Sequence, residues 1–185
     1  MHRRQLLLIV GAGLAAGCSS TPTAEEASAK RREIDTGVDR ALADLYQTTG
    51  ARQLSGKAKG VLVFPKVTSA GFIVGGSYGQ GALRKGNTTA GYYSVGGGSV
   101  GFLVGAESKS MYLLFMTDDA LRKFEASDGW TVGADASVVV LDAAAADASV
   151  SNQTAEKPVL GFVRNQSGLM ANLSIDGSKF NKLKL

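Results

Sequence analysis

The clearest chemical feature of this sequence is a long stretch of basic residues without acidic ones. Between Asp44 and Glu107 there is no Asp or Glu. Six basic residues occur in that interval: Arg52, Lys57, Lys59, Lys66, Arg84 and Lys85. Such side chains bind phosphates and anionic lipid surfaces, so the stretch predicts a basic face for these ligands. The alternative is that the six charges are scattered over the surface and solvated separately.

The chemistry open to the rest of the chain is limited by its N-terminus. The chain has one histidine, His2, and one cysteine, Cys18. A positive start at Arg3 and Arg4, a short apolar run and small residues before Cys18 are typical of a cleaved secretory signal. A mature chain beginning at Cys18 has no histidine, which excludes a Ser-His-Asp triad and a Cys/His zinc site. We therefore expect no enzyme, no metal and no cofactor.

The segment Ala15-Ala16-Gly17-Cys18 resembles the bacterial lipobox. That resemblance implies a signal peptide at residues 1–17 and acylation of Cys18, and Ser19 favours sorting to the outer membrane of a cell envelope. The alternative is an ordinary secretory signal that leaves a free thiol. Residues 18–28 are then the lipidated cysteine with a small, polar, flexible tether, and residues 29–185 form one domain.

Several other patterns have plain structural explanations. Gly96–Gly101 fits a dinucleotide-binding pattern, but an apolar strand-like run follows it instead of a helix. Asp118 and Asp119 suit the positive end of a helix that Thr117 caps. Asp135 is expected to brace a turn, with a functional contact as the alternative. Hydrolysis by two carboxylates such as Asp118 and Asp135 is the enzymatic alternative.

The periodicity of the sequence indicates few helices and many short strands. Apolar residues at three- and four-residue steps predict a helix over about 29–48, and a second, shorter one over 51–58. A strand over 60–64 is expected to end at Pro65, and paired strands over 70–78 and 81–85 are expected around a turn at Gly79-Gln80. Further strands are expected within 91–116, 131–141 and 159–175, with a hairpin turn at 165–168, while 143–156 stays undecided.

Short strands with glycine-rich corners favour an α+β fold. We expect a curved antiparallel sheet, or a small barrel-like sheet, with the N-terminal helix and a short mid-chain helix packed against it.

Several segments together resemble the SYLF domain family. They are Gly60–Val67, Ala70–Gly81, Gly98–Ala106, Met116–Leu121, Gly133–Val138 and Gly168–Ala171. The resemblance implies lipid binding, of phosphoinositides in eukaryotic members, through basic residues and an amphipathic N-terminal segment. It places the basic face at Lys57, Lys59 and Lys66, and the lipid-contacting segment at the helix over 29–48.

The sequence thus favours an envelope lipoprotein that binds anionic phospholipid head groups through the six basic residues. Its expected partner is the membrane, through the lipid anchor and the head groups, with no nucleic acid. The alternative is a structural or protein-binding envelope lipoprotein without lipid selectivity.

Overall fold

The computed structural model describes residues 23–71, 74–100, 105–141, 157–165, 168–169, 175 and 177–185. The predicted signal peptide, Cys18 and the undecided segment 143–156 lie outside these residues. No helix in the described part of the chain is both long and apolar enough to cross a membrane.

The chain begins its described part with a long amphipathic helix, α1 (Ala24–Leu45). Thr23 caps it: its side chain accepts from the Glu26 backbone N–H, and Glu26 accepts from the Thr23 backbone N–H in return. The helix therefore starts earlier than periodicity predicted, and Ala24–Ser28 are helical instead of part of a flexible tether. Its buried residues follow a helical repeat: Ala27, Ile34, Val38, Ala41 and Leu45.

Two shorter helices complete the helical part. The expected second helix is confirmed as α2 (Thr49–Lys57). The mid-chain helix is confirmed as α3 (Asp118–Ala126), with the Thr117 hydroxyl accepting from the Ala120 backbone N–H at 3.2 Å.

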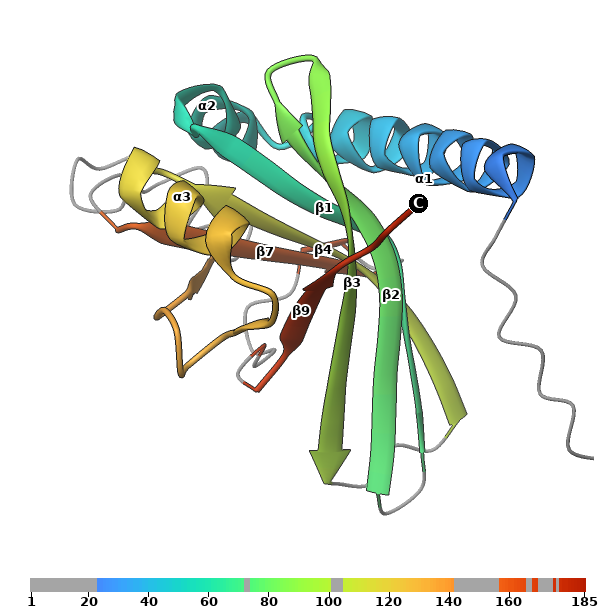
Figure 1. Cartoon of the computed structure of the whole chain (residues 1–185). Coiled ribbons are helices and arrows are strands. Elements are labelled where there is room, and N and C mark those ends of the chain that lie inside the picture. Colours follow the sequence, from blue (N-terminus) through green and yellow to red (C-terminus); the bar gives the residue numbers. More distant parts are fainter. Residues whose placement is uncertain are drawn as a thin grey trace, which may run out of the picture.

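The described strands form one strongly curled sheet (Figure 1). Its strands are β1 (Gly60–Gly71), β2 (Val74–Lys85), β3 (Thr88–Val100), β4 (Gly105–Phe115), β5 (Trp130–Thr131), β6 (Val139–Leu141), β7 (Val159–Asn165), β8 (Gly168–Leu169) and β9 (Lys179–Lys182). Their order is β5-β9-β3-β2-β1-β4-β7-β6, with β8 paired to β7. The α+β prediction is confirmed, but the sheet is mixed, because β6 runs parallel to β7.

The central strands are longer than the sequence suggested. β1 continues through Pro65, because a bulge at that point removes the residue from both neighbouring ladders. β2 runs without a break through Gly79-Gln80, so the predicted turn there is wrong. Gly81 instead allows β2 to lie close to β1, because a Cβ at this position would lie 2.0 Å from the Val63 carbonyl oxygen.

Each face of the sheet carries its own core. One face packs under α1 and α2 and includes Val61, Val63 and Tyr112. The other face packs under α3, where Phe115, Phe124, Trp130 and Phe180 form an aromatic cluster with ring centroids 4.8–6.2 Å apart. The sheet is thus a rigid platform with α1 across one face (Figure 1).

Candidate functional site

The structure does not bring the six predicted basic residues together on one free surface. Three of them contact carboxylates of another element. Lys59 lies 3.7 Å from Asp118, Lys85 lies 2.7 Å from Glu125, and Arg84 pairs with acidic residues of α1. The acid-free stretch of sequence therefore meets acidic side chains that come from outside it. This corrects the expectation of a single six-residue basic face.

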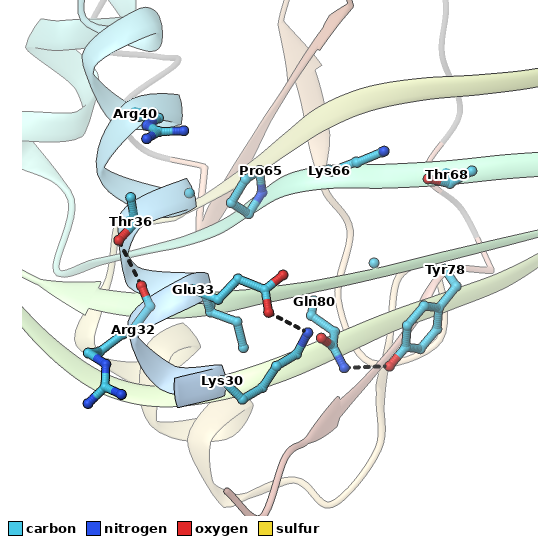
Figure 2. Close-up of a pocket in the computed structure, with 13 residues that line it drawn as sticks. Lys30, Arg32, Glu33, Thr36, Arg40, Pro65, Lys66, Thr68, Tyr78 and Gln80 are labelled. Carbon is cyan, nitrogen blue, oxygen red and sulfur yellow. Dashed lines mark hydrogen bonds and ion pairs between the residues drawn. The ribbon is translucent and has the colours of Figure 1, made fainter. Parts of the chain in front are cut away.

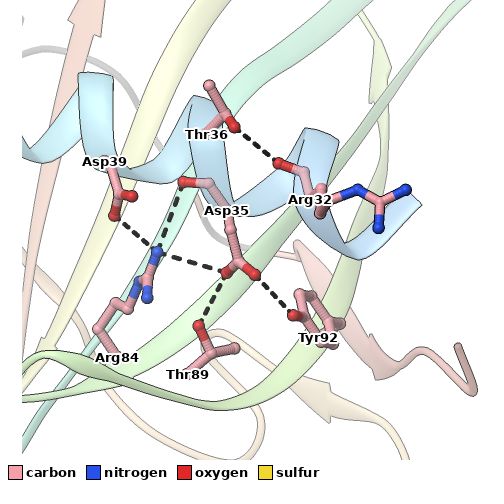
Figure 3. A network of polar contacts seen from close by, with 7 residues as sticks. All are labelled: Arg32, Asp35, Thr36, Asp39, Arg84, Thr89 and Tyr92. Carbon is pink, nitrogen blue, oxygen red and sulfur yellow. Dashed lines mark hydrogen bonds and ion pairs between the residues drawn. The ribbon is translucent and has the colours of Figure 1, made fainter. Parts of the chain in front are cut away.

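Arg84 belongs to a polar network that fixes α1 to the sheet (Figure 3). Its guanidinium lies 2.6 Å from Asp39 and 3.3 Å from Asp35, and the Arg84 side chain is only 11% exposed. The Asp35 carboxylate also accepts hydrogen bonds from Thr89 and Tyr92, both at 2.8 Å. Burial raises the pKa of Tyr92, and its hydrogen bond to Asp35 raises it further. This arrangement holds the helix in place and leaves Arg84 little freedom to bind a ligand.

Arg52 and Lys57 are exposed on α2. That helix follows the C-terminal end of α1 and lies beyond it in Figure 1. The remaining predicted residue, Lys66, lies on the outer side of the β1 bulge and is exposed. Within the described residues, Lys66 contacts no carboxylate.

The bulge in β1 explains why Lys66 projects from the sheet. The register shifts between Val63 and Lys66 on one side of β1, and between Phe64 and Val67 on the other. The Ser110 hydroxyl donates to the Pro65 carbonyl oxygen at 2.8 Å, which satisfies a group that the bulge leaves outside the ladder. α1 crosses directly over Pro65 at Gly37. A side chain at position 37 would crowd this crossing, because its Cβ would lie 3.1 Å from the proline ring.

Beside this bulge lies an open groove of about 680 Å³ between α1 and the outer face of β1 and β2 (Figure 2). Its basic residues are Lys30, Arg32, Arg40 and Lys66. Glu33 is the acidic residue in the lining, and it already pairs with Lys30 at 3.0 Å. We call these four basic residues the groove cations. Arg32, Thr36 and Arg40 follow one another at four-residue steps, so they lie in a row along α1.

The opposite wall of the groove combines polar and apolar surface. Tyr78 and Gln80 project from β2, and the Gln80 amide donates to the Tyr78 hydroxyl at 2.9 Å. Tyr78 is 56% exposed, which is unusual for a large aromatic side chain in the described part of this fold. Such a surface offers cations to phosphate oxygens and an aromatic ring to the apolar part of a ligand.

A second, smaller pocket of about 290 Å³ lies on the other side of Lys66. Arg164 lines it and donates to the Asp44 carbonyl oxygen at 2.6 Å. Lys109 is opposite Val67 in the β1–β4 register, so its side chain is directed to the α3 side of the sheet. Burial lowers the pKa of Lys109 there. This pocket therefore adds one basic side chain, Arg164, to the surface around Lys66.

The carboxylates considered for catalysis have structural contacts. Asp135 accepts from the Thr131 backbone N–H at 2.6 Å and braces the turn before β6, as predicted. Hydrogen bonds from Lys123, and then from Arg122, hold the pKa of Asp119 below its usual value. In the part of the chain that the structure describes, no three Asp, Glu, His or Cys side chains are grouped so that they could hold a metal ion.

Sequence reasoning missed three of the four groove cations. Lys30, Arg32 and Arg40 lie among six acidic residues of α1: Glu25, Glu26, Glu33, Asp35, Asp39 and Asp44. A count of charge along the chain therefore hides them. The spacing of Lys30, Gly37 and Arg40 was the available signal, because steps of seven and three residues place them on one stripe of the helix. That stripe is separate from the one that carries Asp35 and Asp39.

Comparison with known proteins supports the resemblance seen in the sequence. Residues 96–184 match the protein-family model described as "Ysc84: Las17-binding protein actin regulator". That match begins within β3 and continues through β9, and it does not include α1, α2, β1 or β2. No curated protein matches the chain.

Proposed function

Since the chain belongs to the SYLF domain family through residues 96–184, we propose that it binds anionic phospholipid head groups through the groove between α1 and β1–β2. The observation that carries this proposal is the charge of the groove: its lining contains four basic residues and one carboxylate, Glu33, which is paired with Lys30. The proposed site keeps Lys66 from the sequence prediction and replaces Lys59, Arg84 and Lys85, whose charges are engaged elsewhere.

The strength expected from such a surface is moderate. Each basic residue near an anionic membrane contributes about 1 kcal/mol, and the contribution falls off within a Debye length. The three groove cations outside the Lys30–Glu33 pair thus give roughly 3 kcal/mol, which corresponds to weak binding by the isolated domain. A second attachment to the membrane makes weak contacts of this size effective.

The proposal includes that second attachment. Acylation of Cys18, together with removal of residues 1–17, would anchor the chain in a bacterial envelope membrane, with the outer membrane favoured by Ser19. An acyl anchor and a basic surface are two independent attachments, and a combination of this kind gives stable peripheral binding. Under this proposal the chain is a binding protein and not an enzyme.

The second candidate function is binding of a protein partner. The matching family model is described by its binding to a protein, Las17, and by actin regulation. The groove offers a partner both charge and the exposed ring of Tyr78. An acidic segment of a protein would fit the same cations, so this candidate predicts binding without dependence on lipid composition.

Vesicle binding separates the two candidates. The chain from Ser19 to Leu185, without the acyl anchor, is mixed with vesicles of neutral phosphatidylcholine alone and with vesicles that also contain anionic phosphatidylglycerol. Each mixture is measured at low ionic strength, where the Debye length is about 30 Å, and at high ionic strength, where it is about 3 Å. We expect binding to the acidic vesicles alone, weakened at least fivefold at the higher salt. Equal binding to both compositions, or binding unaffected by salt, would contradict lipid recognition by charge and leave the protein-partner candidate.

A further inference from the structure

The distance along the chain between the predicted anchor and the folded domain is very short. The capping box fixes the start of α1 at Thr23 and Ala24. The sequence between Cys18 and Thr23 contains only Ser19-Ser20-Thr21-Pro22. Fully extended, the five Cα steps from Cys18 to Thr23 span at most about 18 Å. The start of α1 therefore stays within about 18 Å of whatever holds Cys18.

The groove lies next to this start of α1. Lys30, its first basic residue, is about 9 Å along the helix axis from Ala24. Arg40, its last one on α1, is about 24 Å along the same axis. The groove thus begins about 9 Å from the end of α1 that the anchor holds close to its membrane.

Turning the groove away from that membrane requires more chain than is present. The domain has three layers, α1, the sheet and α3 (Figure 1). Helices and sheets pack about 10 Å apart, so the layers together are roughly 30 Å thick. A groove on the α1 side that faced a second membrane would place this thickness between α1 and the anchoring membrane. A linker of about 18 Å does not cross it.

We propose that the groove engages head groups of the same membrane that holds Cys18, and that the linker length prevents it from bridging to a second membrane. This inference rests on the proposed function, including acylation of Cys18. A short linker also raises the effective concentration of the head groups at the groove to the millimolar range, which suits contacts that are weak individually. The ligand chemistry is an anionic phospholipid surface on the anchor side.

A tethering assay tests the inference. The chain from Cys18 to Leu185 is coupled through the thiol of Cys18, its only cysteine, to a maleimide lipid in neutral donor vesicles. Acceptor vesicles contain phosphatidylglycerol, and donor–acceptor association is measured by energy transfer between lipid dyes. One variant carries a Gly/Ser insertion of about 20 residues between Ser20 and Thr21, which lengthens the reach by up to about 70 Å. A matched control carries the same insertion after Leu185.

We expect little association of the vesicles with the native linker or with the C-terminal extension, and at least tenfold more with the lengthened linker. With phosphatidylglycerol placed in the donor vesicles, hydrogen exchange of 24–40 and 60–71 should slow for the native linker. Association by the native linker equal to that of the lengthened one would overturn the inference. So would failure of the lengthened linker to associate vesicles while the uncoupled chain still binds acidic vesicles. If the uncoupled chain binds no acidic vesicles either, the proposed function itself is wrong.

Discussion

The attachment of α1 to the sheet can be tested at Asp35. Each oxygen of its carboxylate has a separate donor: Oδ1 accepts from Thr89 at 2.8 Å and lies 3.3 Å from Arg84, while Oδ2 accepts from Tyr92 at 2.8 Å. The substitution Asp35→Asn keeps the shape of the side chain, removes its charge and turns one acceptor into a donor. The new amide NH₂ then faces a hydroxyl or guanidinium group that is also a donor, so two donors meet without an acceptor between them.

The expected cost follows from these contacts. Hydrogen bonds to a charged group contribute about 1.5–3 kcal/mol each. Because the Asp35 side chain is 30% exposed, water screens part of this, and we expect Asp35→Asn to lower the free energy of unfolding by about 2 kcal/mol. For a domain of this size that corresponds to a fall in Tm of roughly 4–8 °C.

Asp39→Asn is the matched control on the same helix. Asp39 contacts the same guanidinium at 2.6 Å, but its side chain is 68% exposed, so its removal should cost at most about 1 kcal/mol. Urea unfolding monitored by circular dichroism measures both values. The reasoning is refuted if Asp39→Asn destabilises the domain as much as Asp35→Asn does, or if Asp35→Asn leaves the urea midpoint unchanged.

Three further predictions concern packing and buried ionisable groups. Gly81→Ala should destabilise the domain by about 3 kcal/mol or prevent folding, because its Cβ would meet the Val63 carbonyl oxygen at 2.0 Å; Gly76→Ala, whose Cβ would lie 3.8 Å from its nearest neighbour, should stay within about 0.5 kcal/mol of wild type in the same urea titration. Burial raises the pKa of Tyr112, whose hydroxyl donates to the Ala41 carbonyl oxygen at 3.0 Å. The folded protein therefore holds the Tyr112 proton to higher pH than the unfolded chain does, and the free energy of unfolding should fall as pH rises above about 10. Tyr112→Phe should cost about 1 kcal/mol at pH 7 and make this alkaline fall in stability shallower. An unchanged dependence of stability on pH in the variant would contradict the prediction. Burial lowers the pKa of Lys109, so its charged form is disfavoured in the fold; Lys109→Met should raise the Tm at pH 7, and a lower Tm would contradict that placement.

Local patterns were sufficient to predict several elements. Thr117 followed by two acidic residues marked the start of α3, and the hairpin between β7 and β8 occurs at residues 165–168 as expected. Asp135 braces a turn, as expected from its place in the segment Gly133-Ala134-Asp135-Ala136. These features depend on residues that are close together in the sequence. A short segment is therefore enough to predict them.

Features set by contacts distant in the sequence were not predictable. Pro65 looked like the end of a strand, but its ring fits a bulge that α1 crosses at Gly37. Gly79-Gln80 looked like a turn, whereas β2 continues through it, and Gly79 and Gly81 allow β2 to approach the bulged part of β1 closely. The pairing of Arg84 with α1 depends on the helix crossing the sheet, which no local pattern shows.

The same limit explains the outcome for the basic residues. An interval of sequence without acidic residues predicts a basic surface only if the interval packs against itself. Here Lys59 and Lys85 meet acidic side chains of α3, while the groove draws Lys30, Arg32 and Arg40 from an acidic segment. The charge of a surface depends on how the elements pack. Lys66 belongs both to the six predicted basic residues and to the groove, because the bulge exposes it.

The most direct test of lipid binding by the groove compares two double variants of the unacylated chain on vesicles that contain phosphatidylglycerol. Arg40→Ala with Lys66→Ala removes two groove cations, while Arg52→Ala with Lys57→Ala removes two exposed charges from α2 and changes net charge equally. At about 1 kcal/mol per residue, the groove variant should bind roughly 30-fold more weakly, and the α2 variant less than threefold more weakly. Equal losses for the two variants would contradict a site in the groove and point to unspecific attraction by net charge.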